Sequence, residues 1–297
     1  MHCGWHQLAY ERELSRGLNL CWIGAHPFAV VRSGDSTRAF DARCPHRGAN
    51  LCTGGRLDRA SIICPFHGFR IGLGEGDQSL HVREYLVLCL GGLVFLRDPR
   101  GEDCGFEAYF RRLESCHYIV PGFSMDILTN AELVIENAFD VQHFQPVHGI
   151  INEPEFDQLD ENDGSFAVAG QFQLPRSPWH KEVLTGSTVM VPFQARAFSP
   201  TLVVSELGGH NPYCMITTAV PLESGCRVHL SLAIKPGAGG TPPAQDDLRY
   251  LLRQATGGLE KDRVIWENLP AEPWLNAQTS DRWILGFREF CQRFFDA

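Results

Sequence analysis

Two kinds of hydrophobic pattern divide the chain. Between residues 20 and 98, short apolar runs are separated by Gly, Pro and Asp. Examples of these runs are residues 28–32, 38–41, 61–64 and 85–96. Runs of this length bounded by turn-forming residues are typical of β-strands, so this part predicts a small all-β unit. Residues 99–112 are polar and compatible with a helix, and the pattern changes after residue 115. The sequence therefore predicts two domains, residues 1–110 and residues 111–297.

The second part has longer alternating segments. Two groups of apolar residues each fall on one face of a strand, namely Phe166, Val168, Phe172 and Leu174, and Val228, Leu230, Leu232 and Ile234. Alternation with a period of two predicts a half-buried antiparallel sheet. Apolar residues from Leu248 to Ala255 recur at helical spacing after two aspartates, and we expect Gly257 and Gly258 to interrupt this helix before a second one that ends at Leu269.

Composition and charge narrow the class of protein. The 297 residues are 21% charged and 44% hydrophobic, which is ordinary for a globular protein. The net charge of −9 argues against nucleic acid or an anionic membrane surface as a partner. The N-terminus lacks the basic and apolar regions of a secretory signal, and no segment reaches transmembrane length, so we expect a cytoplasmic protein. An odd count of 11 cysteines favours free thiols and metal ligands over disulfides.

The first motif consists of two Cys–His pairs. Cys44-Pro45-His46 and Cys64-Pro65-Phe66-His67 each combine one thiolate with one imidazole. A zinc finger places both cysteines before both histidines, whereas a Rieske [2Fe–2S] centre needs two thiolates on one iron and two imidazoles on the other. The order of the ligands thus favours a Rieske cluster held by Cys44, His46, Cys64 and His67. The alternatives are a structural zinc site and two unrelated pairs.

The second motif is a segment rich in polar residues. Asp140 and His143 are three residues apart and would share a face of a helix, whereas His143 and His148 are five apart. We expect Pro146 to bend or end the helix, so that His148 swings back towards His143. Two histidines and one carboxylate form the facial triad of non-haem Fe(II) sites. The alternative is that both histidines are ordinary core or surface residues.

A distant acid supplies the third ligand of this predicted triad. In the late helix, Asp262 shares a stripe with Leu259, Trp266 and Leu269, whereas Glu260 and Glu267 fall elsewhere. An acid on an apolar stripe is unfavourable unless it is paired or bound to metal, which favours Asp262 as the ligand. The alternative is an exposed helix acid.

These motifs resemble the Rieske non-haem iron oxygenases, in the right order and over nearly the whole chain. Residues 44–51, 54–55, 64–68 and 262–266 are most similar to the steroid-acting branch, which includes ketosteroid hydroxylase oxygenases and cholesterol 7-desaturases. The resemblance implies an α+β fold, with an all-β Rieske domain followed by a helix-grip catalytic domain. In that catalytic domain a curved antiparallel sheet wraps around a long helix. Phe69 departs from the commoner Trp, which leaves the substrate open.

The resemblance also implies how the sites work together. The family forms head-to-tail homotrimers in which Asp140 would link His67 of the adjacent subunit to His143, and Asn137 would be a polar neighbour of the iron. Asp140 could also orient the His143 ring, a role compatible with the first. Residues 72–76 (Gly-Leu-Gly-Glu-Gly) do not match the GxGxxG motif and predict a hairpin turn. With no other flavin or nicotinamide motif apparent, a ferredoxin or an NAD(P)H-dependent reductase is the expected electron donor.

We therefore predict an oxygenase component that uses O2 to hydroxylate a C–H bond of a small apolar, polycyclic substrate, steroid-like or a natural product. The same iron chemistry supports desaturation, demethylation, oxidative cyclisation and dihydroxylation, and the sequence does not separate these reactions. An alternative from another class is a Rieske electron carrier without its own catalytic iron.

Overall fold

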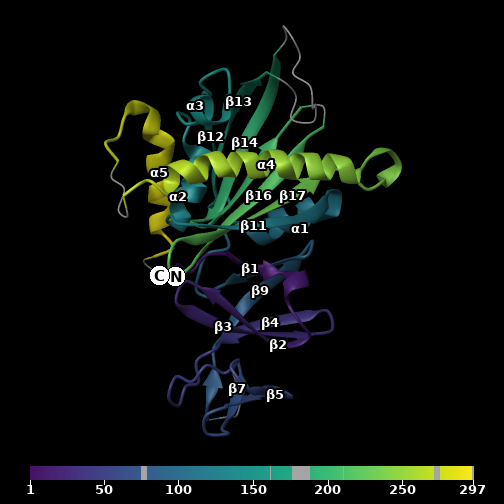
Figure 1. Ribbon diagram of the computed structural model, residues 1–297, viewed down its shortest axis with the longest axis vertical. Coiled ribbons are helices and arrows are strands. Elements are labelled where there is room, and N and C mark those ends of the chain that lie inside the picture. Colours follow the sequence, from purple (N-terminus) through teal and green to yellow (C-terminus); the bar gives the residue numbers. More distant parts are fainter. Residues whose placement is uncertain (75–78, 161, 176–187, 210, 271–274, 296–297) are drawn as a thin grey trace.

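The computed structural model of the protein describes residues 1–74, 79–160, 162–175, 188–209, 211–270 and 275–295. Its two parts are stacked along the long axis, with N-terminal strands at one end and a larger sheet crossed by helices at the other (Figure 1). The predicted α+β class, with an all-β N-terminal domain and a C-terminal domain of sheet and helices, is confirmed.

The N-terminal part contains two sheets. The larger sheet is antiparallel and consists of β1 (His6–Tyr10), β2 (Gly17–Ile23), β3 (His26–Ser33), β4 (Ser36–Asp41), β9 (Glu84–Leu90) and β10 (Leu93–Arg97). Its strand order is β1-β10-β9-β4-β3-β2. The smaller sheet consists of β5 (Arg56–Asp58), β6 (Ser61–Ile63), β7 (Arg70–Leu73) and β8 (His81–Val82), and it forms the lower tip in Figure 1. The turn predicted at residues 72–76 lies partly outside the described residues.

The predicted apolar run at residues 85–96 is two strands. It is broken by Gly91 and Gly92, whose φ angles are +57° and +77°. This left-handed conformation suits glycine, and a Cβ atom at Gly91 would lie 2.3 Å from the Cβ of Ile119. The two glycines therefore close a tight β9–β10 hairpin against the C-terminal part.

The C-terminal part is built on one antiparallel sheet. Its strands are β11 (Tyr118–Ile127), β12 (Asp157–Leu159), β13 (Phe166–Leu174), β14 (Val189–Ser199), β15 (Leu202–Leu207), β16 (Tyr213–Pro221) and β17 (Cys226–Ile234). Their order is β11-β17-β16-β15-β14-β13-β12. The helices are α1 (Phe106–Cys116), α2 (Ala131–Glu136), α3 (Phe144–His148), α4 (Gln245–Trp266) and α5 (Arg282–Gln292). Among the described residues, none of these helices combines the length and apolar character needed to cross a bilayer.

Both predicted alternating faces point into the main core. Phe166, Val168 and Phe172 of β13 pack there, as do all four predicted residues of β17. However, β17 is not half-buried as expected, because His229 and Ser231 on its other face are also buried. Tyr10 of the N-terminal part covers that face, and its hydroxyl donates to the Leu230 carbonyl at 3.2 Å.

Helix α4 lies across the seven-stranded sheet (Figure 1). The predicted interruption at Gly257 and Gly258 is wrong, because α4 is continuous through both. Glycine weakens a helix by only about 1 kcal/mol, and the burial of Leu251, Leu259 and Trp266 on either side offsets this.

The predicted division at residue 110 falls inside α1 and stays a prediction. Phe106 and Phe110 of this helix join a core that also holds Trp5 and Tyr10 from β1. The same core includes residues of β15 to β17, such as Leu202 and Ile216, so packing is continuous across the predicted boundary.

Candidate metal centres

The two Cys–His pairs lie on two loops built alike, residues 44–48 and 64–68. In each loop, a glycine N–H donates to the carbonyl of the cysteine four residues earlier: Gly48 to Cys44 at 2.8 Å and Gly68 to Cys64 at 3.0 Å. Gly48 and Gly68 have φ angles of +74° and +71°. This left-handed backbone conformation would be strained in a residue with a side chain. The repeated Cys-to-Gly spacing thus produces two matching turns at the tip of the molecule.

The four predicted cluster ligands lie close together, with the two cysteines buried and the two histidines exposed. Cys44 and Cys64 are buried and close enough to affect each other's pKa, whereas His46 and His67 are exposed, with ring centroids 4.8 Å apart. Burial raises the pKa of the Cys44 thiol. Burial acts in the same direction on Cys64, but backbone hydrogen bonds at Phe66 and His67 outweigh it and lower the pKa of that thiol. Paired thiols beneath paired imidazoles fit the division of ligands in a Rieske cluster.

The second candidate centre begins in the short segment after α2. Residues Asn137–Phe139 form a 3-10 helix, and Asp140 is extended, so Asp140 and His143 do not share a helix as predicted. Pro146 does not bend or end α3. It lies in the first turn of α3, where its missing N–H is not needed, and Gly149 ends the helix with a φ angle of +72°.

The two histidines and the distant acid converge. Potential ligand atoms of His143, His148 and Asp262 all lie within 4.8 Å of one another. His148 Nε2 is 3.2 Å from Asp262 Oδ1, and the two imidazole rings are nearly perpendicular, with centroids 5.0 Å apart. Two ligands at right angles on one metal, each bound at about 2.1 Å, would be about 3 Å apart, so these residues fit a shared ion.

His143 is held in one tautomer by its neighbours. Its Nδ1 lies 2.6 Å from the Asp140 backbone carbonyl and therefore carries the proton, so Nε2 accepts from Asn137 Nδ2 at 3.0 Å. The Asp140 carboxylate is farther from Nδ1, at 3.8 Å. Burial lowers the pKa of His143, which keeps the imidazole neutral, as a metal ligand must be. The orienting group is thus the Asp140 carbonyl, not its side chain.

Helix α4 positions the acid. Asp262 is 8% exposed and lies on the buried stripe with Leu259 and Trp266, so the predicted helical phase is correct for these three residues. Leu269 follows the end of α4 and is exposed, unlike the prediction. A Cβ atom at Gly258 would lie 3.9 Å from the His148 ring, which shows how closely α4 approaches α3 there.

The three residues border an apolar cavity of about 270 Å³ between α4 and the sheet. Phe144, Phe172 and Phe193 form part of its wall. Ser205 and Thr217, on neighbouring strands of the sheet, add hydroxyl groups to the lining. Neither residue was predicted from the sequence, although each interrupts the apolar face of a strand that points into the cavity.

A further residue without a sequence signal supports the centre. Glu136 precedes Asn137 and is buried, and its carboxylate accepts two hydrogen bonds from Arg288 of α5, at 2.5 and 2.9 Å. Burial raises the pKa of Glu136 despite this ion pair. The pair fixes the end of α2 against α5, but its partners are 152 residues apart, so no local pattern reveals it.

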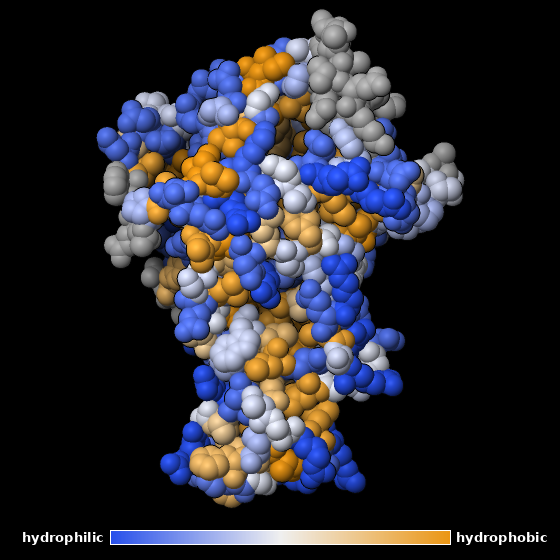
Figure 2. Space-filling model, in the orientation of Figure 1, coloured by the Kyte–Doolittle hydropathy of each residue, from blue (hydrophilic) through white to orange (hydrophobic). Residues whose placement is uncertain are grey.

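The two candidate centres lie in different parts of the molecule, far apart along its long axis. The small sheet with the Cys–His loops forms the lower tip, whereas α3 and α4 lie in the upper part (Figure 1). Asp140 and His67 are therefore not brought together within one chain. Phe66 and Phe69 at the tip are exposed by 59% and 42%, and the face drawn in Figure 2 also shows hydrophobic residues at this end.

Comparison with known proteins covers both parts. Residues 4–82 match the Rieske [2Fe-2S] domain, and residues 106–295 match the 3-ketosteroid 9alpha-hydroxylase C-terminal domain. A cholesterol 7-desaturase of Hemicentrotus pulcherrimus is 41% identical over 166 residues, which are 49% of this chain and 35% of that protein. The oxygenase component of a 3-ketosteroid-9-alpha-monooxygenase from Rhodococcus rhodochrous is 27% identical over 165 residues, 49% of this chain and 41% of that protein.

The fold as a whole also has a solved counterpart. Dicamba monooxygenase bound to 3,6-dichlorosalicylic acid superposes with a TM-score of 0.72, at 18% sequence identity, over 99% of this chain and 97% of that one. At this identity the likeness concerns the fold. In contrast, the sequence matches span only about a third of the length of the cholesterol desaturases.

Proposed function

The chain belongs to the Rieske non-haem iron oxygenases, which use a Rieske cluster and a mononuclear iron, and we propose that it hydroxylates a C–H bond of an apolar, polycyclic substrate. The observation that carries this proposal is the apolar cavity beside His143, His148 and Asp262. The lining suits a hydrophobic molecule with few polar groups. In this family, the cluster supplies electrons and the iron activates O2.

We assign the ligands as follows: Cys44, His46, Cys64 and His67 hold the cluster, and His143, His148 and Asp262 hold the iron. Three protein ligands on one side of an ion leave the other positions free for O2 and water. The Asp140 carbonyl orients His143 by accepting from Nδ1, which leaves Nε2 for the iron, and Asn137, whose Nδ2 lies 3.0 Å from Nε2, would be a polar neighbour of the ion. The phenylalanine wall keeps bulk water from the substrate.

We further propose that the protein is a head-to-tail homotrimer in which His67 of one subunit meets Asp140 of the next. Support comes from the separation of the two centres in one chain and from the exposed His46 and His67 rings at the tip. Asp140 has a side chain that is 27% exposed and lies beside His143. Replacing Asp140 by Asn should leave both centres loaded while product formation nearly stops. Full activity of that variant would contradict the bridge.

Desaturation is the second candidate reaction, because the relative from Hemicentrotus is named a cholesterol 7-desaturase. The two reactions differ in the fate of oxygen: hydroxylation adds one oxygen atom from O2, whereas desaturation removes two hydrogens and adds none.

The test begins with anaerobically purified protein. Roughly three irons per two acid-labile sulfides, with a rhombic Rieske EPR signal after dithionite reduction, are expected. Cholesterol and a 3-ketosteroid are then incubated with ¹⁸O2, NADPH, a ferredoxin and its reductase, and products are analysed by mass spectrometry. Labelled alcohol supports hydroxylation, and an unlabelled alkene supports desaturation. Two irons per chain and no turnover would favour an electron carrier.

A further inference from the structure

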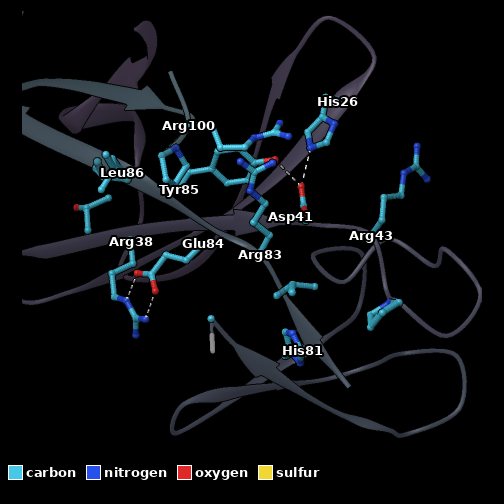
Figure 3. Close-up of a pocket in the computed structure, with 16 residues that line it drawn as sticks. His26, Arg38, Asp41, Arg43, His81, Arg83, Glu84, Tyr85, Leu86 and Arg100 are labelled. Carbon is cyan, nitrogen blue, oxygen red and sulfur yellow. Dashed lines mark hydrogen bonds and ion pairs between the residues drawn. The ribbon is translucent and has the colours of Figure 1, made fainter. Parts of the chain in front are cut away.

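A large groove lies on the N-terminal part, away from the substrate cavity. It measures about 1330 Å³ and lies between β4 and β9 of the larger sheet and β8 of the smaller one (Figure 3). Pro45, which stands between the predicted ligands Cys44 and His46, forms one edge. A molecule seated in this groove would therefore lie beside a cluster-binding loop.

The groove is positively charged in an acidic protein. Its lining contains four arginines and two acids, whereas the whole chain carries a net charge of −9. Arg38 is neutralised by Glu84 through two hydrogen bonds of 2.7 Å. Arg83 and Arg100, however, share the single carboxylate of Asp98, which is 5% exposed. Asp41, the second acid of the lining, is close enough to Arg83 to offset the remaining guanidinium charge.

Arg43 carries the uncompensated positive charge of the groove. It immediately precedes Cys44, is exposed and forms no ion pair within the described part of the chain. Figure 3 shows Arg43 on one side of the groove and the Arg38–Glu84 pair on the other. The four arginines are thus spread around the groove, and with the three acids Glu84, Asp41 and Asp98 against them one positive charge, that of Arg43, is left over.

The lining of the groove also has an apolar part and a hydrogen-bonded part. Leu86 of β9 is 43% exposed there, whereas Tyr85, which precedes it in the strand, is only 5% exposed. The Tyr85 hydroxyl donates to Asp41 at 2.9 Å, and His26 Nε2 lies 2.7 Å from the same oxygen. An apolar part bordered by charged residues is typical of protein interfaces, and a hydrogen-bonded lining reduces the entropy lost on binding.

We propose that this groove is the docking surface of the electron donor, a small acidic one-electron carrier protein. This inference rests on the proposed need for external electrons. The donor gives up one electron, which reduces one Fe(III) of the cluster to Fe(II). Charge complementarity speeds the encounter, and the Pro45 edge brings the donor next to the cluster-binding loop.

A second groove, about 930 Å³, lies where the two parts of the molecule meet and is a weaker candidate. Its lining holds as many acids (Glu13 and Glu223) as arginines (Arg43 and Arg227), and Arg227 is already paired with Asp126. It therefore offers no electrostatic attraction for an acidic partner. In the proposed trimer, the tip itself faces the neighbouring subunit, which leaves the side groove for the donor.

The test measures reduction of the cluster in the whole 297-residue chain, without substrate. Flavodoxin hydroquinone is mixed anaerobically with oxidised protein, and flavodoxin semiquinone is followed by its absorbance. In Arg43→Gln and in Arg100→Gln, the second-order rate constant at low salt should fall several-fold, and in the double variant by about 10-fold or more. These differences should vanish at high salt, where the charges are screened.

Arg249→Gln is a matched control. Arg249 and Arg100 have side chains that are both 66% exposed, and each pairs with one aspartate, but Arg249 lies on α4. The control should react like the wild type. Equal rates in all variants, or an equal loss in the control, would overturn the proposal.

Reduction by dithionite distinguishes a loss of docking from damage to the cluster, because dithionite reduces the cluster without docking in the groove. Unchanged reduction by dithionite is expected, and a parallel loss would place the effect on the cluster and overturn the docking role. Because cluster reduction needs neither the mononuclear iron nor substrate, a failure of the proposed hydroxylation would leave this result unaffected.

Discussion

The two candidate metal centres are built from the sequence in different ways. Each Cys–His pair sits in a turn of five residues that supplies its own hydrogen bonds and its own glycine. The His–His–Asp centre, in contrast, joins α3 to Asp262 of α4, more than a hundred residues later. The first depends on local geometry and lies near the surface, whereas the second requires the whole C-terminal core. A centre whose ligands lie in short loops can therefore be recognised in the sequence as a motif. In a centre whose ligands are far apart in the sequence, the distant ligand can be predicted only from its position on the buried face of a helix.

The largest effect should come from breaking the local centre. Cys64→Ala removes one of two buried thiols, and we expect complete loss of acid-labile sulfide and of the Rieske EPR signal. The mononuclear iron should remain, because its ligands come from another part of the molecule. Cys89→Ala, at a partly buried cysteine outside the loops, is the control and should keep the cluster. Loss of all iron from Cys64→Ala would mean that the centres are not independent.

The assembled centre should fail when its distant member is removed. Asp262→Ala should weaken iron binding by more than roughly 100-fold, since even residues that only support ligands cost 10- to 100-fold. Iron analysis after dialysis against a chelator measures this loss, while the Rieske EPR signal should persist. Glu260→Ala, on the same helix and away from the centre, should change nothing. Normal iron retention in Asp262→Ala would refute the assignment.

Acid titration tests whether the N-terminal and C-terminal parts unfold together. His6 of β1 is buried beside Thr201 of the C-terminal part, and burial lowers the pKa of His6 from 6.5 to about 4. An unfolded chain binds this proton near pH 6.5 and the folded chain only near pH 4. The stability that His6 contributes is thus complete above pH 6.5 and is lost as pH falls towards 4.

The expected loss from this group is about 2 kcal/mol in the free energy of unfolding between pH 7 and pH 5. Denaturant titrations at both pH values, followed by circular dichroism and cluster absorbance, measure it. His6→Asn should remove this share of the pH dependence, and His81→Asn, at an exposed residue, should not. Separate transitions for the two signals would show that the regions unfold independently.

The smallest effect concerns the helix that carries Asp262. A Cβ atom at Gly257 would contact nothing within 4 Å, so Gly257→Ala should raise the free energy of unfolding by about 0.5–1 kcal/mol without changing iron content. Gly149→Ala should have the opposite sign, by about 1 kcal/mol, because Gly149 has a φ angle of +72°. Destabilisation by Gly257→Ala would mean that α4 needs flexibility there.

Much of the fold could be predicted from the periodicity of apolar residues, which shows which face of a strand or helix is buried but not what covers it. The inward faces of β13 and β17 follow from alternation, and the phase of Asp262 follows from the 3.6-residue period. The low helix propensity of glycine does not predict the course of α4, because tertiary packing outweighs it. The helix continues through Gly257 and Gly258, since residues on both sides are buried. Proline disfavours helix interiors, but Pro146 lies in the first turn of α3, where it does not break the helix.

Other features depend on residues far apart in the chain. The second buried face of β17 exists because Tyr10 covers it, and Glu136 is held by Arg288. Neither partner is marked by spacing or residue type. The cavity lining is likewise a product of several strands at once, so Ser205 and Thr217 could be suspected from the sequence but not assigned.

The core shared by β1, α1 and β15–β17 has a consequence for recombination between relatives. A crossover at the predicted boundary would separate Trp5 and Tyr10 from the residues that they pack against, such as Phe198 and Leu202. A chimera would then inherit two halves of one core from different parents, with mismatched side-chain volumes. Exchange of the iron–sulfur module should succeed only when β1 and the β9–β10 residues of this core, such as Leu93 and Phe95, come from the same parent as the seven-stranded sheet.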